Sequence, residues 1–133
     1  MRRHSVVTRV RYGETDQMGV VYHANYFLYF ELGRTELMRA AGFPYAELER
    51  RGVFLVVTDA GCRYRAPARY DEEIRIDTRV ARLGKATVRF EYEVRGAGDR
   101  LLADGHTELA AVDRITQAPV RLPEEIAARL EGP

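Results

Sequence analysis

The sequence predicts an α+β fold in which a five-stranded antiparallel sheet wraps around a central helix. Apolar and polar residues alternate in five segments, which is the pattern of strands with one face in a core and one face in water. Short turns join the last strands, and this favours antiparallel pairing. The helix expected after the first strand is apolar around most of its circumference, so other structure must enclose it.

The expected elements follow one another without a repeat or a linker, so we assign residues 1–133 to one domain. Pro44 and Gly52 bracket a short second helix, and Gly33 in the long helix could let a neighbouring backbone approach closely. In chain order we expect a strand at 6–12, a loop at 13–22, the long helix from Asn25 to a stop at 42–44, the short helix at 45–51, strands at 54–64, 73–80, 86–95 and 101–113, and a last helix at 123–130.

Composition and charge exclude several classes of function. Hydrophobic residues make up 46% of the chain and charged residues 31%, as in globular proteins. The formal charge is +1 and the basic residues are scattered, so we expect no nucleic-acid binding. The apolar runs at 26–30 and 53–57 are far shorter than the roughly 20 residues of a membrane span, and no apolar segment follows the basic start. We therefore expect a cytoplasmic location. The single cysteine, Cys62, is expected to be a buried or half-buried thiol.

The loop before the long helix is the best candidate for a functional site. Residues 13–22 follow neither the strand period nor the helix period, and they place Asp16 shortly before the enclosed helix. The first backbone N–H groups of a helix lack partners and carry a partial positive charge, so they can hold a carbonyl oxygen as negative charge develops on it. A carboxylate beside them could activate water against that carbonyl or attack it directly.

The same residues also allow a purely structural interpretation. Asp16 to Gly19 could form only a turn closed by glycine, and Asn25 is expected to be a helix cap rather than a catalyst. The imidazole of His23 could simply bond to backbone at the helix start. Glu14 is expected to be solvated or paired with arginine. Spacing alone leaves both interpretations open.

Two stretches of the chain resemble the signature of a known family. They read ETDQMGVVYHANY at 14–26, followed by Phe30, Glu31 and Arg34, and YRAPARYD at 64–71. The similarity covers essentially the whole chain, and the first stretch is the more specific of the two. On these residues the chain resembles the 4-hydroxybenzoyl-CoA thioesterase family, nearest the bacterial acyl-CoA thioesterase branch that includes the Tol-Pal-associated enzymes.

The resemblance implies a hot-dog fold and hydrolysis of an acyl-CoA thioester to free acid and CoA. It implies that Asp16 is the general base or nucleophile and that the backbone N–H of His23 polarises the thioester carbonyl. It also implies a dimer joined along the long strand, usually paired into a tetramer, with active sites at the subunit interface. Neither a metal nor another cofactor is expected.

Further residues are expected to contact the substrate. From their positions, Tyr22, Tyr26 and Thr58 are candidate walls of the pocket. Members of the family bind the phosphates of CoA with basic residues near the strand turn that holds Arg82 and Lys85, often from the neighbouring subunit. Arginine suits bidentate phosphate contacts, although turn residues are often only solvated.

Two other functions remain open at this stage. One is a hydratase or dehydratase of the same fold, in which a histidine works with an acid on the acyl chain. The other is a non-catalytic acyl-CoA-binding protein. An aspartate before the helix fits thioester cleavage better than hydration. The sequence leaves open the acyl group, the choice between dimer and tetramer, and the choice between nucleophilic and general-base chemistry.

Overall fold

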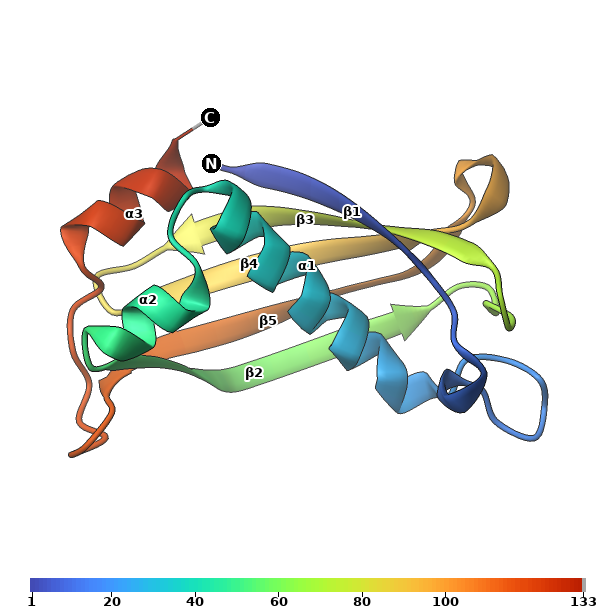
Figure 1. Ribbon diagram of the computed structural model, residues 1–133, viewed down its shortest axis with the longest axis horizontal. Coiled ribbons are helices and arrows are strands. Elements are labelled where there is room, and N and C mark those ends of the chain that lie inside the picture. Colours follow the sequence, from blue (N-terminus) through green and yellow to red (C-terminus); the bar gives the residue numbers. More distant parts are fainter. Residues whose placement is uncertain (133) are drawn as a thin grey trace.

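One antiparallel sheet with a long helix lying across its inner face organises the chain (Figure 1), which confirms the predicted fold class. The computed structural model describes residues 1–132. The strands lie side by side in the order β1-β3-β4-β5-β2, so β1 and β2 are the two edges. The elements are β1 Arg3–Arg9, α1 Tyr26–Ala40, α2 Tyr45–Arg50, β2 Val53–Tyr64, β3 Glu73–Leu83, β4 Thr87–Arg95, β5 Leu101–Asp113 and α3 Glu124–Glu131, with short 3-10 turns η1 Tyr12–Glu14, η2 His23–Asn25 and η3 Ala97–Asp99.

The core lies between α1 and the inner face of the sheet. Phe30 of α1 is fully buried and stacks on Tyr92 of β4, with ring centroids 4.4 Å apart. The Tyr92 hydroxyl shares a 2.6 Å hydrogen bond with Thr107 of β5, so this buried phenol has a polar partner. Burial of each large apolar side chain contributes about 1.5–3 kcal/mol, and this burial is what holds α1 in place.

The first strand differs from the prediction at both ends. The strand begins at Arg3, which pairs with Arg79 of β3, rather than at residue 6. It ends at Arg9, because the N–H of Val10 turns to the carbonyl of Glu72. Tyr12, which continued the apolar alternation, lies in η1 and is 78% exposed. Alternation alone could not show where the pairing partner stops.

The β2 strand contains a bulge that changes which residues share its inner face. Strict alternation over 54–64 predicts that Phe54 and Ala60 lie on one face, but a β-bulge between Val57 and Asp59 shifts the alternation by one residue, so this prediction is wrong for the first half of the strand. Leu55 is therefore the buried residue that shares the inner face with Ala60, whereas Phe54 is 38% exposed. The sequence of β2 alone does not show the bulge, because a bulge is defined by how the strand pairs with its neighbour.

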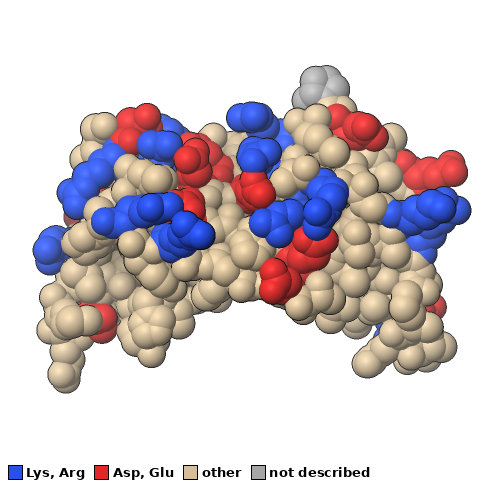
Figure 2. All heavy atoms as spheres, turned by 180° about the vertical axis from the view of Figure 1, so that it is seen from behind, with Lys and Arg blue, Asp and Glu red and all other residues tan. Residues whose placement is uncertain are grey.

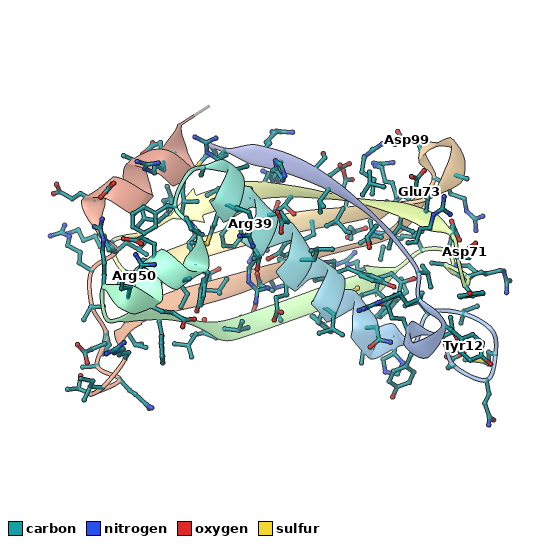
Figure 3. The ribbon with its side chains drawn as sticks, viewed as in Figure 1. Tyr12, Arg39, Arg50, Asp71, Glu73 and Asp99 are labelled. Carbon is teal, nitrogen blue, oxygen red and sulfur yellow. The ribbon has the colours of Figure 1, made fainter. Side chains whose placement is uncertain are left out.

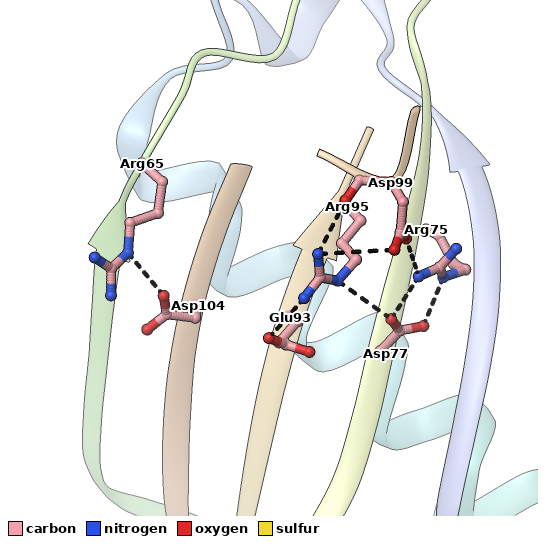
Figure 4. Close-up of polar contacts among 7 residues, drawn as sticks. All are labelled: Arg65, Arg75, Asp77, Glu93, Arg95, Asp99 and Asp104. Atoms are coloured by element: carbon pink, nitrogen blue, oxygen red, sulfur yellow. Dashed lines mark hydrogen bonds and ion pairs between the residues drawn. The ribbon is translucent and has the colours of Figure 1, made fainter. Parts of the chain in front are cut away.

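The outer face of the sheet carries a lattice of alternating charges, seen from behind in Figure 2. At one end, Arg75 and Arg95 both contact Asp77 and Asp99, at distances of 2.6–4.0 Å (Figure 4). The hydrogen bond from Arg75 is the largest cause that lowers the pKa of Asp77. A broad hollow of about 1080 Å³ lies over this face, but paired charges line it and the loop around Asp16 does not. Exposed pairs of this kind contribute little stability each.

No helix within residues 1–132 has both the length and the apolar composition needed to cross a membrane.

The sheet approaches α1 closely at Gly33, but the expectation that backbone would lie there is wrong. A Cβ at this position would overlap the Thr78 hydroxyl and come within 2.8 Å of Ile76 Cγ2. Side chains of β3, rather than backbone, fill the space that glycine leaves. The Thr78 hydroxyl is buried and has no hydrogen-bond partner among residues 1–132. Its branched side chain is stiff in a strand and cannot easily move aside.

We therefore expect Gly33→Ala to lower the free energy of unfolding by about 1–3 kcal/mol, as overpacking does. In an unobstructed helix the same change would raise it by about 1 kcal/mol. Urea unfolding followed by circular dichroism measures the difference. Gly13→Ala is the control, because nothing lies within 4 Å of a Cβ there. A Gly33→Ala protein as stable as the wild type would contradict this account of the packing.

Candidate active site

The loop between β1 and α1 forms a tight turn that holds Asp16 half-buried. The Asp16 N–H donates to the carbonyl of Val20 and the Asp16 carbonyl accepts from the N–H of Gly19, each at 2.9 Å. Gly19 has a φ of 80°, which glycine adopts without strain. The predicted turn is therefore present. The turn is compatible with a catalytic role of Asp16, because it determines where the Asp16 carboxylate lies.

One oxygen of the Asp16 carboxylate is fixed and the other is available. Oδ1 accepts a 2.9 Å hydrogen bond from the N–H of Met18. Oδ2 accepts none from any part of the chain that the structure describes. A carboxylate held by one oxygen keeps its orientation, while the other oxygen can accept a proton from water or attack an electrophile.

The chain enters α1 through the 3-10 turn η2, which begins at His23. The N–H of Asn25 donates to the carbonyl of Tyr22 at 2.9 Å. Within residues 1–132 the N–H groups of His23 and Ala24 meet no acceptor, as expected at the start of a helical segment. The structure thus places backbone donors at His23, at the end of the same loop that carries Asp16.

Asn25 takes the N-cap position of α1, as predicted, but not the capping hydrogen bond. Its side chain makes no capping hydrogen bond to the start of α1. Instead the Asn25 amide donates to the backbone carbonyl of Glu14 at 2.8 Å, which closes the loop at its base. The chain between Glu14 and Asn25 was too irregular for the sequence to show that these two residues meet.

Tyr64, at the end of β2, holds the loop from the other side. Its hydroxyl donates to the carbonyl of His23 at 2.9 Å. Tyr26 is 3% exposed and its ring meets that of Tyr64 edge-on, 5.3 Å between centroids. Burial, together with nearby Cys62, raises the pKa of Tyr64 to about 12, so the phenol remains a donor at neutral pH. Tyr64 lies in the second sequence stretch, but nothing in its spacing indicated this contact.

The structure brings only part of the predicted site together. Asp16, Tyr22, His23 and Tyr26 lie on one loop and the helix start that follows it. Thr58 lies six residues before Tyr64 on β2, which is about 20 Å along a strand. Its hydroxyl contacts the carbonyl of Glu108 at 3.3 Å.

Arg82 and Lys85 lie at the far end of the sheet from Asp16 in the same chain. The β3 strand starts beside the loop and ends near Arg82, about 30 Å away by strand length. In Figure 3, Tyr12 and Asp71 mark the loop end of the molecule, and Arg50 marks the opposite end. Arg82 contacts Glu108 at 3.0 Å, and Lys85 is exposed.

A cavity of about 400 Å³ lies beside α1, and the sequence did not reveal it. Glu31, Arg34 and Thr35 of α1 form its polar side, and Leu55 of β2 contributes to its apolar side. The Arg34 side chain is only 15% exposed and lies 4.0 Å from Glu31. Between this cavity and Tyr64, the inner face of β2 exposes Val57 and Ala60.

No group of three or more His, Cys, Asp or Glu side chains is placed to hold a metal ion anywhere in the described part of the chain. The absence of a cofactor stays a prediction.

A five-stranded antiparallel sheet with a long helix packed against its inner face is the hot-dog fold. The profile of the thioesterase-like superfamily matches residues 10–130, so the chain belongs to this superfamily.

Individual relatives are similar over most of their length. The acyl-CoA thioester hydrolase YbgC of Escherichia coli O6:H1 is 33% identical over 123 residues, covering 92% of both chains. The acyl-CoA thioesterase YbgC of Haemophilus influenzae is 34% identical over 125 residues, covering 93% of this chain and 91% of the relative. The crystal structure of a DHNA-CoA thioesterase from Staphylococcus aureus superposes with a TM-score of 0.89 at 34% identity, covering 92% of this chain and 82% of that one.

Proposed function

We propose that this protein hydrolyses the thioester bond of an acyl-CoA to give a free carboxylic acid and CoA. The observation that carries the proposal is one loop that presents both a carboxylate oxygen of Asp16 and the N–H of His23, neither of them used by the described chain. Relatives similar over more than nine-tenths of their length carry the name of this activity, which supports the assignment.

The site residues can perform the reaction in two ways. In both, the His23 N–H donates to the thioester oxygen and stabilises the charge that forms as the carbonyl is attacked. Asp16 either removes a proton from water, whose oxygen then attacks the carbonyl carbon, or attacks that carbon itself to form an anhydride that water opens. In both, the C–S bond breaks and the sulfur leaves as the CoA thiolate, which takes up a proton. Tyr22 and Tyr26 are the proposed walls beside the reacting carbonyl.

The acyl group is proposed to lie along the inner face of β2, over Val57 and Ala60, and to end near the cavity at Arg34. Val57 and Ala60 are exposed on the side of the sheet that faces α1, which supports this route for the acyl group. The acyl preference, membership of the Tol-Pal-associated branch and a cytoplasmic location stay predictions.

Asp16→Asn should lower kcat for acyl-CoA hydrolysis about a hundredfold or more, because loss of a general base costs 10²–10⁴-fold. The amide oxygen can still accept from Met18, so the turn and CoA binding should persist. Thiol release from a panel of acyl-CoA substrates measures the rate. Asp71→Asn is the control, since this exposed residue has a φ of 67° that asparagine tolerates.

An Asp16→Asn protein that hydrolyses acyl-CoA at nearly the wild-type rate would remove Asp16 from the mechanism. Wild-type protein that binds acyl-CoA without releasing thiol would instead favour a non-catalytic binding protein. A change in double-bond absorbance without thiol release would favour a hydratase.

We also propose that two copies pair along β2. This edge strand is 12 residues long and exposes Phe54, Val56 and Val57, whereas the other edge, β1, has only seven residues and begins and ends with an arginine. A long apolar edge strand is a template for pairing with another chain. Pairing there would extend the sheet across two subunits and place each loop near the partner.

Phe54→Lys combined with Val56→Lys should convert the dimer to monomers, because like charges opposite each other destabilise strand pairs. Light scattering coupled to size-exclusion chromatography reports the mass. Val7→Lys on β1 is the matched control, since Val7 is also an exposed valine on an edge strand, at 55%. The same dimeric mass before and after the double change, or a monomeric wild type, would reject pairing along β2.

Arg82 and Lys85 are proposed to bind the phosphates of CoA from the neighbouring subunit. They lie at the opposite end of the sheet from Asp16 in the same chain, so a second copy is the proposed source of their contact with the substrate. Both are exposed cations at the β3–β4 turn, which suits phosphate contact.

Replacing both residues with alanine should raise KM for acyl-CoA about tenfold, which corresponds to about 1.4 kcal/mol of binding free energy. The corresponding acyl-pantetheine lacks the nucleotide phosphates, so its kcat/KM should not change. Steady-state kinetics with the two substrates separates these effects. Equal losses on both substrates would mean that Arg82 and Lys85 do not bind the nucleotide.

A further inference from the structure

Glu14 makes an unusual set of side-chain contacts for an acid in a surface loop. Its side chain is only 13% exposed. Oε1 accepts hydrogen bonds from the Tyr29 hydroxyl at 2.9 Å and from the Arg11 N–H at 2.8 Å. Oε2 is 3.2 Å from Nε of Arg11, whose side chain is 82% exposed. The two hydrogen bonds to Oε1 are therefore better shielded from solvent than the contact with the Arg11 side chain.

The main chain of Glu14 joins the two ends of the loop. Its carbonyl accepts from the N–H of Tyr22 at 2.9 Å and from the Asn25 amide at 2.8 Å. Its own N–H donates to the carbonyl of Arg11 at 2.9 Å. One residue thus contacts the segment just after β1, the end of the loop and, through its side chain, α1.

These contacts determine the spacing of the two groups proposed to act on the thioester. Asp16 lies two residues after Glu14, and the free N–H of His23 follows Tyr22, which is bonded to Glu14. Tyr29 of α1 is only 3% exposed, so its position in the core determines where Glu14 is held. Burial, and then the hydrogen bond to Glu14, raises the pKa of Tyr29, so its hydroxyl stays a donor.

We infer that Glu14 is a positioning residue for thioester hydrolysis. By bonding to Tyr29 it anchors the base of the loop to the buried helix, and so it holds the Asp16 carboxylate at the right distance from the His23 N–H. A misplacement of about 1 Å can cost a hundredfold in rate. The inference rests on the proposed function and adds a residue that does not touch the substrate.

Glu14→Ala should lower kcat tenfold to a hundredfold with KM within about twofold, because the reacting groups are displaced while the substrate surfaces remain. Glu14→Gln should keep nearly the wild-type kcat, since its amide oxygen can still accept from Tyr29 and from Arg11 N–H. Tyr29→Phe should lower kcat in the same way as Glu14→Ala. Glu36→Ala is the control, because it removes an acid paired with an arginine three residues later, Arg39, on the surface of α1.

Backbone amide exchange measured by mass spectrometry tests the anchor without relying on turnover. The N–H groups of Asp16, Gly19 and Tyr22 are hydrogen-bonded within the loop, and exchange reports local opening. They should exchange faster in Glu14→Ala and Tyr29→Phe, but not in Glu14→Gln or Glu36→Ala. Exchange in β4 and β5 should stay unchanged in every folded variant.

Several results would overturn the inference. Glu14→Ala with the kcat and loop exchange of the wild type would show that Glu14 positions nothing. Glu14→Gln as impaired as Glu14→Ala would show that the charge itself acts, which positioning through Oε1 excludes. If Glu14→Ala does not fold, Tyr29→Phe decides alone by the same two measurements. Wild-type protein without thiol release would reject the proposed function, and loop exchange would still decide the role of Glu14.

Discussion

The requirement to enclose α1 governs the rest of this structure. The sheet buries one side of this apolar helix by direct contact at Gly33 and through the stacking of Phe30 on Tyr92, whereas Phe27 and Leu28 stay exposed. Once α1 is fixed against β3 and β4, its first turn has a defined position at one end of the sheet. The loop that reaches this turn from β1 must then close over a short span, and the hydrogen bonds at Glu14 and Tyr64 hold it there.

The proposed chemistry depends on a loop that hydrogen bonds hold in place. Loops usually carry functional residues because they can adopt irregular geometry, but they hold that geometry only when they are anchored. Here the anchors come from elements far apart in sequence, with Tyr29 on α1 and Tyr64 on β2. Each anchor is a phenol whose raised pKa keeps it protonated at neutral pH, so each hydroxyl remains a hydrogen-bond donor.

Local patterns were enough to predict the fold class and the position of the candidate site. Alternation located the strands, the apolar surface identified the enclosed helix, and the irregular loop drew attention to Asp16. The failures concern information that lies between segments. The bulge after Val57 depends on how β2 pairs with β5, and the contacts of Glu14 and Asn25 depend on how the loop folds back. Such features arise from tertiary structure, and no spacing along a single strand or loop records them.

The separation between the loop and the cavity at Arg34 has an evolutionary consequence. Bond cleavage is proposed to occur at Asp16 and His23, on the loop before α1, whereas the cavity wall is built from residues one to three turns along the helix and from the strands β2 and β5. Exchanges at Arg34 or Thr35 can therefore remodel the far end of the substrate without moving the reacting groups. A scaffold divided in this way can change its acyl-group specificity while the proposed hydrolytic groups keep their positions.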